Sequence, residues 1–334
     1  MIRRRAFLRG MMAAGTATAF SARPARGVAA EPLETKTIKL VKIPRGICVA
    51  PQYIADELFR AEGFSEVQYV DVPDGAGTYK VLASGEADVS MAFVAPFLIQ
   101  VDAGSPIVML AGIHVGCFEL VGTEKVRSVR DLKGKTVAVL GLGSAPHVFI
   151  ASMAAHVGLD PQKDIRFVAH PAAVGMRLLA EGTVDAYLGF PPDPQELRAK
   201  KIGHVVVNSS VDRPWSQYFC CIATGNREFV RKHPEATKRA LRAILKATDV
   251  CALEPVRAAR TMVDQGFTPN YDYAAEAMRQ IPYNKWRTYD PEDTVRFYSL
   301  RLHEAGMIKS SPQKIIAQGT DWRFLKELKK ELKG

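Results

Sequence analysis

Two segments of this chain are near copies of each other. The first reads LASGEADVSMAF over residues 82–93, and the second reads LAEGTVDAYLGF over residues 179–190. Leucine, alanine, glycine, aspartate and phenylalanine recur at the same internal positions, 97 residues apart. Solenoid repeats have periods of about 20 to 50 residues, so this spacing is too long for a solenoid. The chain is therefore expected to contain two similar lobes.

Each copy closes a region in which strand and helix patterns alternate. The first region predicts strands over 37–43, 66–72 and 87–93, with helices over 51–63 and 74–85. The second predicts strands over 135–141 and 165–170, a helix that ends at Gly158, and a last strand inside the second copy. This alternation gives a parallel sheet flanked by helices. The predicted fold class is therefore α/β, with two lobes of the same strand and helix order.

The remaining sequence predicts connections and covering helices. Residues 107–122 have the pattern of one long extended segment, and the sequence beyond Gly225 is almost entirely helical. Asp290 is expected to cap a helix that begins at Pro291. We expect these helices to pack back on the first lobe, and the basic and acidic face of the tail, FLKELKKELKG, to be solvated.

The first thirty residues have the layout of an export signal. Three arginines precede an apolar run, small residues follow up to Ala30, and RRAFLR at residues 4–9 resembles the twin-arginine motif. Residues 1–30 are therefore expected to be a signal cleaved near Ala30, which places the protein in the periplasm. A cytoplasmic protein with a basic amphipathic leader is the alternative, but the segment contains no acidic residue. No cysteine precedes Cys48, so neither a lipid anchor nor stable membrane insertion is expected.

Net charge does not indicate a polyanionic partner. The whole chain has 45 basic and 35 acidic residues, but six of the basic ones lie in the leader, which leaves an excess of about four. No stripe of lysine and arginine interleaved with aromatic residues is present, so nucleic acid is not expected as a partner.

The five cysteines do not have the spacing of a disulfide framework or of a metal site. Cys220 and Cys221 are adjacent, and a strained vicinal disulfide between them is one reading. Two buried thiols in a strand or a crossing segment are the favoured reading.

Known catalytic motifs do not occur in this sequence. Gly141-Leu142-Gly143 follows a predicted strand and opens a helix, but Pro146 stands where a dinucleotide-binding loop needs its third glycine. The seven histidines are dispersed. A catalytic constellation is therefore not expected.

The same loop, GLGSAPH over residues 141–147, is a candidate binding element. Backbone N–H groups at a helix start favour an anion or a polar headgroup, which makes Gly143, Ser144 and Ala145 candidate contacts. Ser144 as a plain helix cap is the alternative. His147 is a candidate donor to a ligand, with a solvent-facing bystander as the alternative.

Other candidate contacts follow the predicted strands, because open α/β sheets bind ligands at the carboxyl ends of their parallel strands. Phe93 and Phe190 end the two copies, and both are candidates for ligand contact or for capping the core. The further candidates are Arg45, Cys48, Val94, Asp193 and Trp215.

The segment SVRDLKGKTVAVLGLGSAPHVFIASMAAHVGLDP, over residues 128–161, carries a resemblance together with the two LAxGxxD units that end at Asp88 and Asp185. In these motifs the chain, from about Thr37 to Gly334, resembles the substrate-binding proteins of ABC importers. The similarity is to the nitrate, sulfonate and taurine group, which includes relatives that handle the pyrimidine precursor of thiamine.

The resemblance implies a bilobed periplasmic-binding fold of type II with C-terminal helices, in which hinge closure traps a ligand. Lobe 1 would combine residues 36–122 and 220–334, and lobe 2 would be residues 124–218. The crossings would be the strands at 121–123 and 219–223. The implied partners of this monomer are a small-molecule solute and an ABC permease with its ATPase. No cofactor, metal or catalysed reaction is implied.

The ligand is less defined than the fold. Arg45 is the main basic residue in the expected cleft loops, and Asp193 would suit a cationic or hydrogen-donating group. The apolar and aromatic residues would suit an aromatic or heterocyclic acid. An enzyme on the same fold, with His147 or Cys48 as its reactive group, and a ligand sensor for a membrane receptor are the alternatives.

Overall fold

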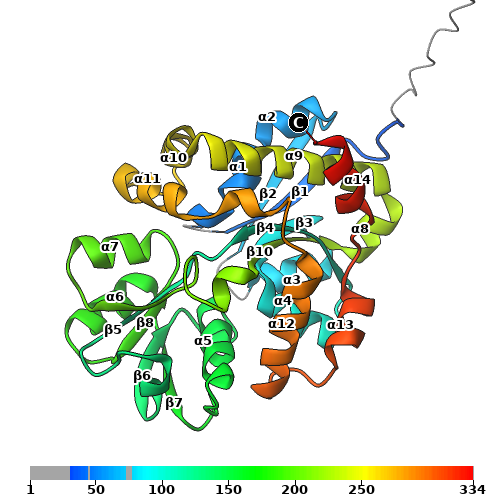
Figure 1. Ribbon diagram of the computed structural model, residues 1–334. Coiled ribbons are helices and arrows are strands. Elements are labelled where there is room, and N and C mark those ends of the chain that lie inside the picture. The colour runs from blue at the N-terminus through cyan, green and yellow to red at the C-terminus, as the bar shows by residue number, and fades with distance from the viewer. Residues whose placement is uncertain (1–30, 44–45, 73–76, 334) are drawn as a thin grey trace, which may run out of the picture. The chain divides into compact units, whose positions relative to one another are not determined.

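The structure, a computed structural model, describes residues 31–43, 46–72 and 77–333. The predicted export signal and Arg45 lie outside these ranges. From Leu33 onward the chain forms one compact unit that contains two sheets of five strands each (Figure 1). None of its described helices combines the length and the apolar character needed to cross a membrane.

The first sheet gathers strands from both ends of the chain. Its order is β2 (Glu66–Asp71), β1 (Thr37–Lys42), β3 (Val89–Phe93), β10 (Phe219–Asn226) and β4 (Ile107–Val115). Strand β1 pairs in parallel with β2 and β3, whereas β10 runs antiparallel to both β3 and β4. The predicted parallel core is confirmed, and the late strand β10 makes the sheet mixed.

The second sheet repeats this plan. Its order is β7 (Ile165–Ala169), β6 (Lys135–Val139), β8 (Ala186–Gly189), β5 (Glu119–Gly122) and β9 (His204–Asn208). Strand β6 is parallel to β7 and β8, and β5 is antiparallel to β8 and β9. In each sheet the strand that arrives from the other sheet is therefore the antiparallel one.

Helices fill the connections and cover the sheets (Figure 1). Helices α3 and α4 pack against the first sheet, and α5 and α6 pack against the second. The α-helices are α1 (Ala50–Ile54), α2 (Asp56–Ala61), α3 (Gly77–Ser84), α4 (Val94–Asp102), α5 (Ala145–His156), α6 (Ala172–Ala180), α7 (Asp193–Ala199), α8 (Arg227–Lys232), α9 (Pro234–Leu253), α10 (Pro255–Asp264), α11 (Tyr271–Gln280), α12 (Pro291–Glu304), α13 (Pro312–Gly319) and α14 (Arg323–Glu331). Short 3-10 helices span Ile47–Val49, Val129–Leu132, Trp215–Gln217 and Tyr283–Lys285.

The duplicated aspartate has the same structural task in both sheets. Asp88 accepts a hydrogen bond from the backbone N–H of Lys39 in β1 at 2.8 Å, and its own N–H donates to the Lys39 carbonyl. Asp185 does the same with Thr136 in β6, at 2.9 Å from the Thr136 N–H. Each aspartate thus ties the start of its strand to the neighbouring strand, so this part of the repeat builds the frame.

The predicted extended segment 107–122 is two strands, which belong to different sheets. The chain turns at Gly116, whose φ of +48° is in the left-handed region that favours glycine. A Cβ atom at this position would lie 2.4 Å from the backbone N and Cα of Ser210, in the other segment that joins the sheets. The two connecting segments therefore touch at Gly116.

One hydroxyl group holds the two connecting segments together. Ser209 Oγ accepts from the N–H groups of Cys117 and Phe118 at 3.1 and 2.9 Å, and it lies 2.9 Å from the Phe118 carbonyl, to which it donates. The crossings thus lie at about 116–118 and 209–218. The residues that were predicted to form the crossings, 121–123 and 219–223, instead lie at the end of β5 and at the start of β10.

The predicted helix over 51–63 is divided into α1 and α2 at Ala55. The apolar stripe on α9 is confirmed, and Asp290 caps α12 through the N–H of Glu292, as predicted. Not all C-terminal helices stay on the first sheet, because α12 packs against both α4 and α5.

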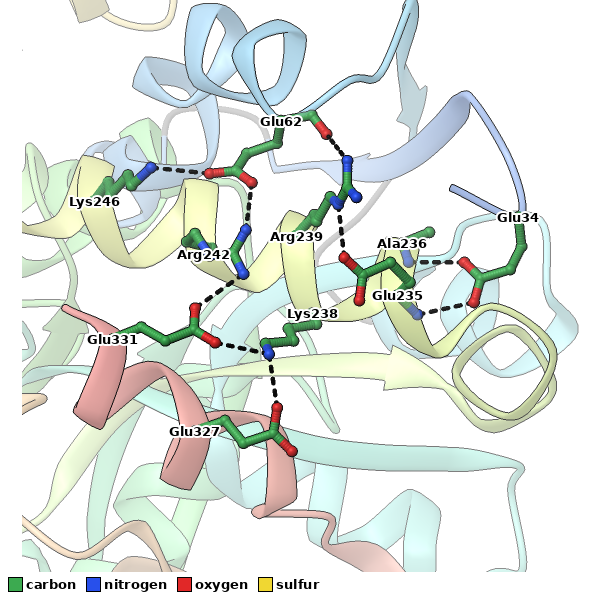
Figure 2. A network of polar contacts seen from close by, with 10 residues as sticks. All are labelled: Glu34, Glu62, Glu235, Ala236, Lys238, Arg239, Arg242, Lys246, Glu327 and Glu331. Atoms are coloured by element: carbon green, nitrogen blue, oxygen red, sulfur yellow. Dashed lines mark hydrogen bonds and ion pairs between the residues drawn. The ribbon is translucent and has the colours of Figure 1, made fainter. Parts of the chain in front are cut away.

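The expected solvated face of the tail is confirmed, because Lys326, Glu327, Lys330 and Glu331 are exposed. Its two glutamates also form ion pairs with α9. Lys238 of α9 contacts Glu327 and Glu331 of α14, each at 2.7 Å, and Arg242 contacts Glu331 at 2.9 Å. Figure 2 shows these pairs continuing to Glu62, which follows α2 and contacts Arg242 at 2.7 Å. Helix α9 is therefore tied by charge to both α2 and α14.

Candidate ligand-binding site

A cavity of about 400 Å³ lies between residues of the two sheets. Segments that follow β1, β3, β6, β7 and β8 contribute to its wall, as expected for the carboxyl ends of parallel strands. The lining residues are Ile43, Gly46, Cys48, Val49, Thr78, Tyr79, Ala92, Phe93, Cys117, Phe118, Leu140, Ala145, Pro146, Ala169, His170, Pro171, Phe190 and Cys221.

Aromatic rings form a continuous part of this wall. Phe118, from the first connecting segment, has ring contacts with both Phe93 and Phe190, at centroid distances of 5.2 and 5.9 Å. Phe93 and Phe190, the last residues of the two sequence copies, are therefore connected through the ring of Phe118, which belongs to neither copy. Edge contacts of this kind fix ring orientation, which gives the cavity a defined shape.

Four of the predicted contact residues line the cavity: Cys48, Phe93, Ala145 and Phe190. The lining does not include the other described candidates, which are Val94, Gly143, Ser144, His147, Asp193 and Trp215. Val94 is fully buried at the start of α4.

The loop 141–147 uses its polar groups internally. The N–H of Gly143 donates to His147 Nδ1 at 3.0 Å, and the Ser144 hydroxyl donates to the carbonyl of Gly141 at 2.6 Å. Burial lowers the pKa of His147, whose ring packs on Phe167. Ser144 occupies the N-cap position without a side-chain cap bond. The bond to His147 therefore engages the Gly143 N–H that was predicted to meet a ligand.

Asp193 and Trp215 have partners within the protein. The Asp193 carboxylate is 3% exposed and accepts a hydrogen bond from the Tyr187 hydroxyl at 2.5 Å. Trp215 is 4% exposed and packs on Phe149 and Phe297, at 5.2 and 5.6 Å between ring centroids. Both side chains thus support the walls of the fold behind the cavity.

The described lining contains no aspartate, glutamate, lysine or arginine. Its ionisable groups are three thiols, the Tyr79 phenol and the His170 imidazole. Burial raises the pKa of Tyr79 well above its usual value, so this phenol is a neutral donor. The described part of the lining therefore offers a ligand a largely apolar surface with a few hydrogen-bonding groups.

The thiols of the wall include a candidate nucleophile. Hydrogen bonds from the thiols of Cys117 and Cys221 hold the pKa of Cys48 well below its usual value, whereas burial raises the pKa of those two neighbours. A thiolate is the reactive form of cysteine. Cys117, Phe118 and Cys221 were not predicted as lining residues, although the adjacent cysteines at 220 and 221 marked this strand.

Comparison with known proteins places this geometry in a family. The model of the NMT1-like family matches residues 31–264. A 4-amino-5-hydroxymethyl-2-methylpyrimidine phosphate synthase of Saccharomyces cerevisiae is 25% identical over 234 residues, which cover 64% of this chain and 67% of that protein. The taurine-binding periplasmic protein of Escherichia coli K12 is 26% identical over 187 residues, covering 55% and 57%.

The fold has a close counterpart among solved structures. The periplasmic nitrate-binding protein NrtA of Synechocystis PCC 6803 matches with a TM-score of 0.75 at 16% identity, over 91% of this chain and 90% of that chain. The predicted periplasmic-binding fold, with two α/β sheets and C-terminal helices, is thereby confirmed. With this fold and a family match over most of its length, the chain belongs to the NMT1-like family and resembles the nitrate-, sulfonate- and taurine-binding proteins.

Proposed function

We propose that this protein is the solute-binding component of an ABC-type importer and that its solute is a small aromatic or heterocyclic molecule. The observation that carries the proposal is the cavity at the strand ends of both sheets, with an aromatic wall and no charged residue in its described lining. Among the described lining residues, a small, fully charged anion would find no side chain of opposite charge to replace its hydration. A flat ring can contact Phe93, Phe118 and Phe190 and keep one or two polar groups paired.

Capture by closure of two lobes is part of the proposal. The lobes would be residues 36–122 with 220–334, and residues 124–218, with β5, at the end of the first range, paired into the second sheet. Arg198 of α7 contacts Glu276 of α11 at 2.7 Å, and Gln195 contacts Gln280 at 3.3 Å. These contacts join α7 of the second lobe to α11 of the first, and Arg198 also pairs with Glu119, next to the first connecting segment. We assign them as a latch for the closed form.

Delivery follows from this role. The protein would be exported through the signal at residues 1–30, act as a monomer in the periplasm, and hand its solute to the membrane permease with its ATPase. The similarity to proteins named for nitrate, sulfonate and taurine binding supports a solute-binding role.

One observation favours a second candidate, an enzyme of pyrimidine or cofactor-precursor synthesis. Relatives named as pyrimidine phosphate synthases match this chain, and Cys48, with a lowered pKa, lines the cavity. A ligand sensor for a membrane receptor would use the same cavity.

The first test is native mass spectrometry of residues 31–334, followed by identification of any small molecule released on denaturation. An unchanged, stoichiometric heterocycle supports the importer component. A covalent adduct on Cys48, or turnover of the released molecule, would overturn it in favour of the enzyme.

A matched pair of variants then tests the cavity with the identified solute. Phe190→Ala removes a half-buried ring from the wall, and Phe229→Ala removes a half-buried ring from α8, outside the lining. Loss of about 2 kcal/mol of apolar contact predicts about 30-fold weaker binding for Phe190→Ala and no change for Phe229→Ala. Equal affinities for the two variants contradict the assignment of the cavity.

A further inference from the structure

Five buried metal-binding side chains meet at the base of the cavity. They are Cys48, His114, Cys117, Cys220 and Cys221, brought together from the first 3-10 helix, β4, the first connecting segment and β10. The ligand atoms of Cys48, His114 and Cys221 lie within 4.8 Å of one another, and so do those of His114, Cys117 and Cys220. Three parts of the chain that are distant in sequence, at residue 48, at 114–117 and at 220–221, thus meet around one imidazole.

The imidazole is oriented as a ligand. His114 is fully buried, and its Nδ1 lies 3.0 Å from the carbonyl oxygen of Gly116, to which it donates. Its other nitrogen, Nε2, is a buried acceptor without a hydrogen-bond partner in the described part of the chain. An unpaired buried acceptor destabilises a fold. Metal-binding histidines use this arrangement, in which a backbone carbonyl fixes one nitrogen and leaves the other for the metal.

The sulfur atoms are reduced and close together. All five cysteines of the chain are free and buried. The Sγ atoms of Cys117 and Cys220 are 3.4 Å apart, which is hydrogen-bond contact for thiols. Cys251, in α9, is the one cysteine outside the cluster, and it is equally buried.

We propose that this cluster binds a thiophilic, closed-shell divalent cation of the Zn²⁺ type, held by Cys48, His114 Nε2 and Cys221, with Cys117 and Cys220 as the adjoining thiol pair. Thiolate and imidazole ligands select cations of this class over Mg²⁺ and Ca²⁺, which prefer oxygen. Two thiols release their protons to solvent on binding, so the two thiolates balance the ion's double charge.

The site faces the solute cavity on one side. Cys48, Cys117 and Cys221 line the cavity, while His114 and Cys220 lie behind them. A bound ion would therefore form part of the cavity floor and present an open coordination position to a donor atom of a solute. The cation site does not depend on the proposed transport role, because its three protein ligands all come from this chain.

The test uses the full chain, purified with a reductant under anaerobic conditions, and Zn²⁺ titrated against a chromophoric chelator. We expect one equivalent of Zn²⁺ to bind. Cys48→Ser and His114→Gln should each weaken binding about 100-fold, since each removes one of a few ligands that share the binding free energy. Cys251→Ser, the matched buried control, should bind as the unmodified chain does.

A second readout separates ligation from a folding defect. Co²⁺ in place of Zn²⁺ should give a thiolate-to-cobalt charge-transfer band, and Cys221→Ala should reduce this band while circular dichroism stays unchanged. The proposal is overturned if the reduced chain binds less than a small fraction of an equivalent, or if Cys251→Ser weakens binding as much as Cys48→Ser. A disulfide that includes Cys48 or Cys221 in the freshly isolated chain would also overturn it.

Discussion

Replacing Gly116 by alanine is expected to destabilise the protein through the contact between the two connecting segments. Gly116 has a φ of +48°, and an added Cβ would approach the Cα and N atoms of Ser210 to 2.4 Å. Ordinary contacts of a Cβ atom lie near 3.4–4 Å, so one of the two backbones must move by about 1 Å. Neither backbone moves freely, because Ser209 bonds the segments together.

The magnitude follows from two separate costs. A non-glycine residue in the left-handed region costs about 1–2 kcal/mol. Forcing extra volume into a packed region costs about another 1–3 kcal/mol. Together these predict a loss of about 2–5 kcal/mol in the free energy of unfolding for Gly116→Ala.

A second glycine isolates the first cost. Gly134 has a φ of +73°, and nothing lies within 4 Å of the position of its Cβ. Gly134→Ala should therefore lose only the conformational part, about 1–2 kcal/mol. Urea unfolding followed by circular dichroism and tryptophan fluorescence compares the two variants. Equal losses in both would refute the argument, because they would show that the connecting segments separate without cost. Gly116→Ala should also weaken binding of the identified solute, since the connecting segments set the lobe positions.

Three further outcomes are expected. Glu62→Gln should lower the free energy of unfolding by about 1–3 kcal/mol, because the buried carboxylate of Glu62 pairs with Arg242 at 2.7 Å and with Lys246 at 2.9 Å. The control is Glu228→Gln, which removes an exposed ion pair with Arg231 and should leave the midpoint of urea unfolding unchanged. Burial acts to raise the pKa of Glu34, but hydrogen bonds from the first N–H groups of α9 lower this pKa overall. Glu34→Gln should therefore lower the free energy of unfolding by up to about 1 kcal/mol at neutral pH. The difference from the unmodified protein should vanish in unfolding curves as the pH falls through the lowered pKa, and a difference that stays constant with pH would contradict this prediction. Glu276→Gln should weaken solute binding a few-fold in calorimetry while unfolding of the empty protein stays unchanged; unaltered affinity would exclude the latch.

The frame of the fold could be predicted because local signals carry it. The alternation of strand and helix and the glycines that end helices act over short stretches of sequence, and each LAxGxxD segment marks its own sheet although the two copies lie 97 residues apart. The antiparallel strands could not be predicted in this way. Strand β10 enters beside β3 only because the chain returns from the second sheet, which is a property of topology rather than of the residues in β10.

The candidate site was predicted in part for a similar reason. The rule that ligands bind at strand ends located Cys48, Phe93 and Phe190 on the cavity wall, and the expected helix start after Gly143 located Ala145. Phe118 was missed because the turn at residues 116–118 is hidden within a continuous apolar run. The sequence also does not show whether a polar residue near a strand end contacts a ligand or another part of the protein. Asp193 bonds to the Tyr187 hydroxyl, and these two side chains meet only when β8 and α7 pack together.

The positions of Asp88 and Asp185 show that the residues that stabilise the two sheets are different from the residues that line the cavity. The two aspartates bond to backbone N–H groups at strand starts, remote from the strand ends that form the cavity. Lining residues can therefore be exchanged during evolution without disturbing the scaffold, and relatives with similar frames can diverge widely in what they bind. For protein engineering, the same separation means that Phe118, Ala145 and Phe190 can be randomised to change ligand specificity, while the duplicated LAxGxxD segments are left intact.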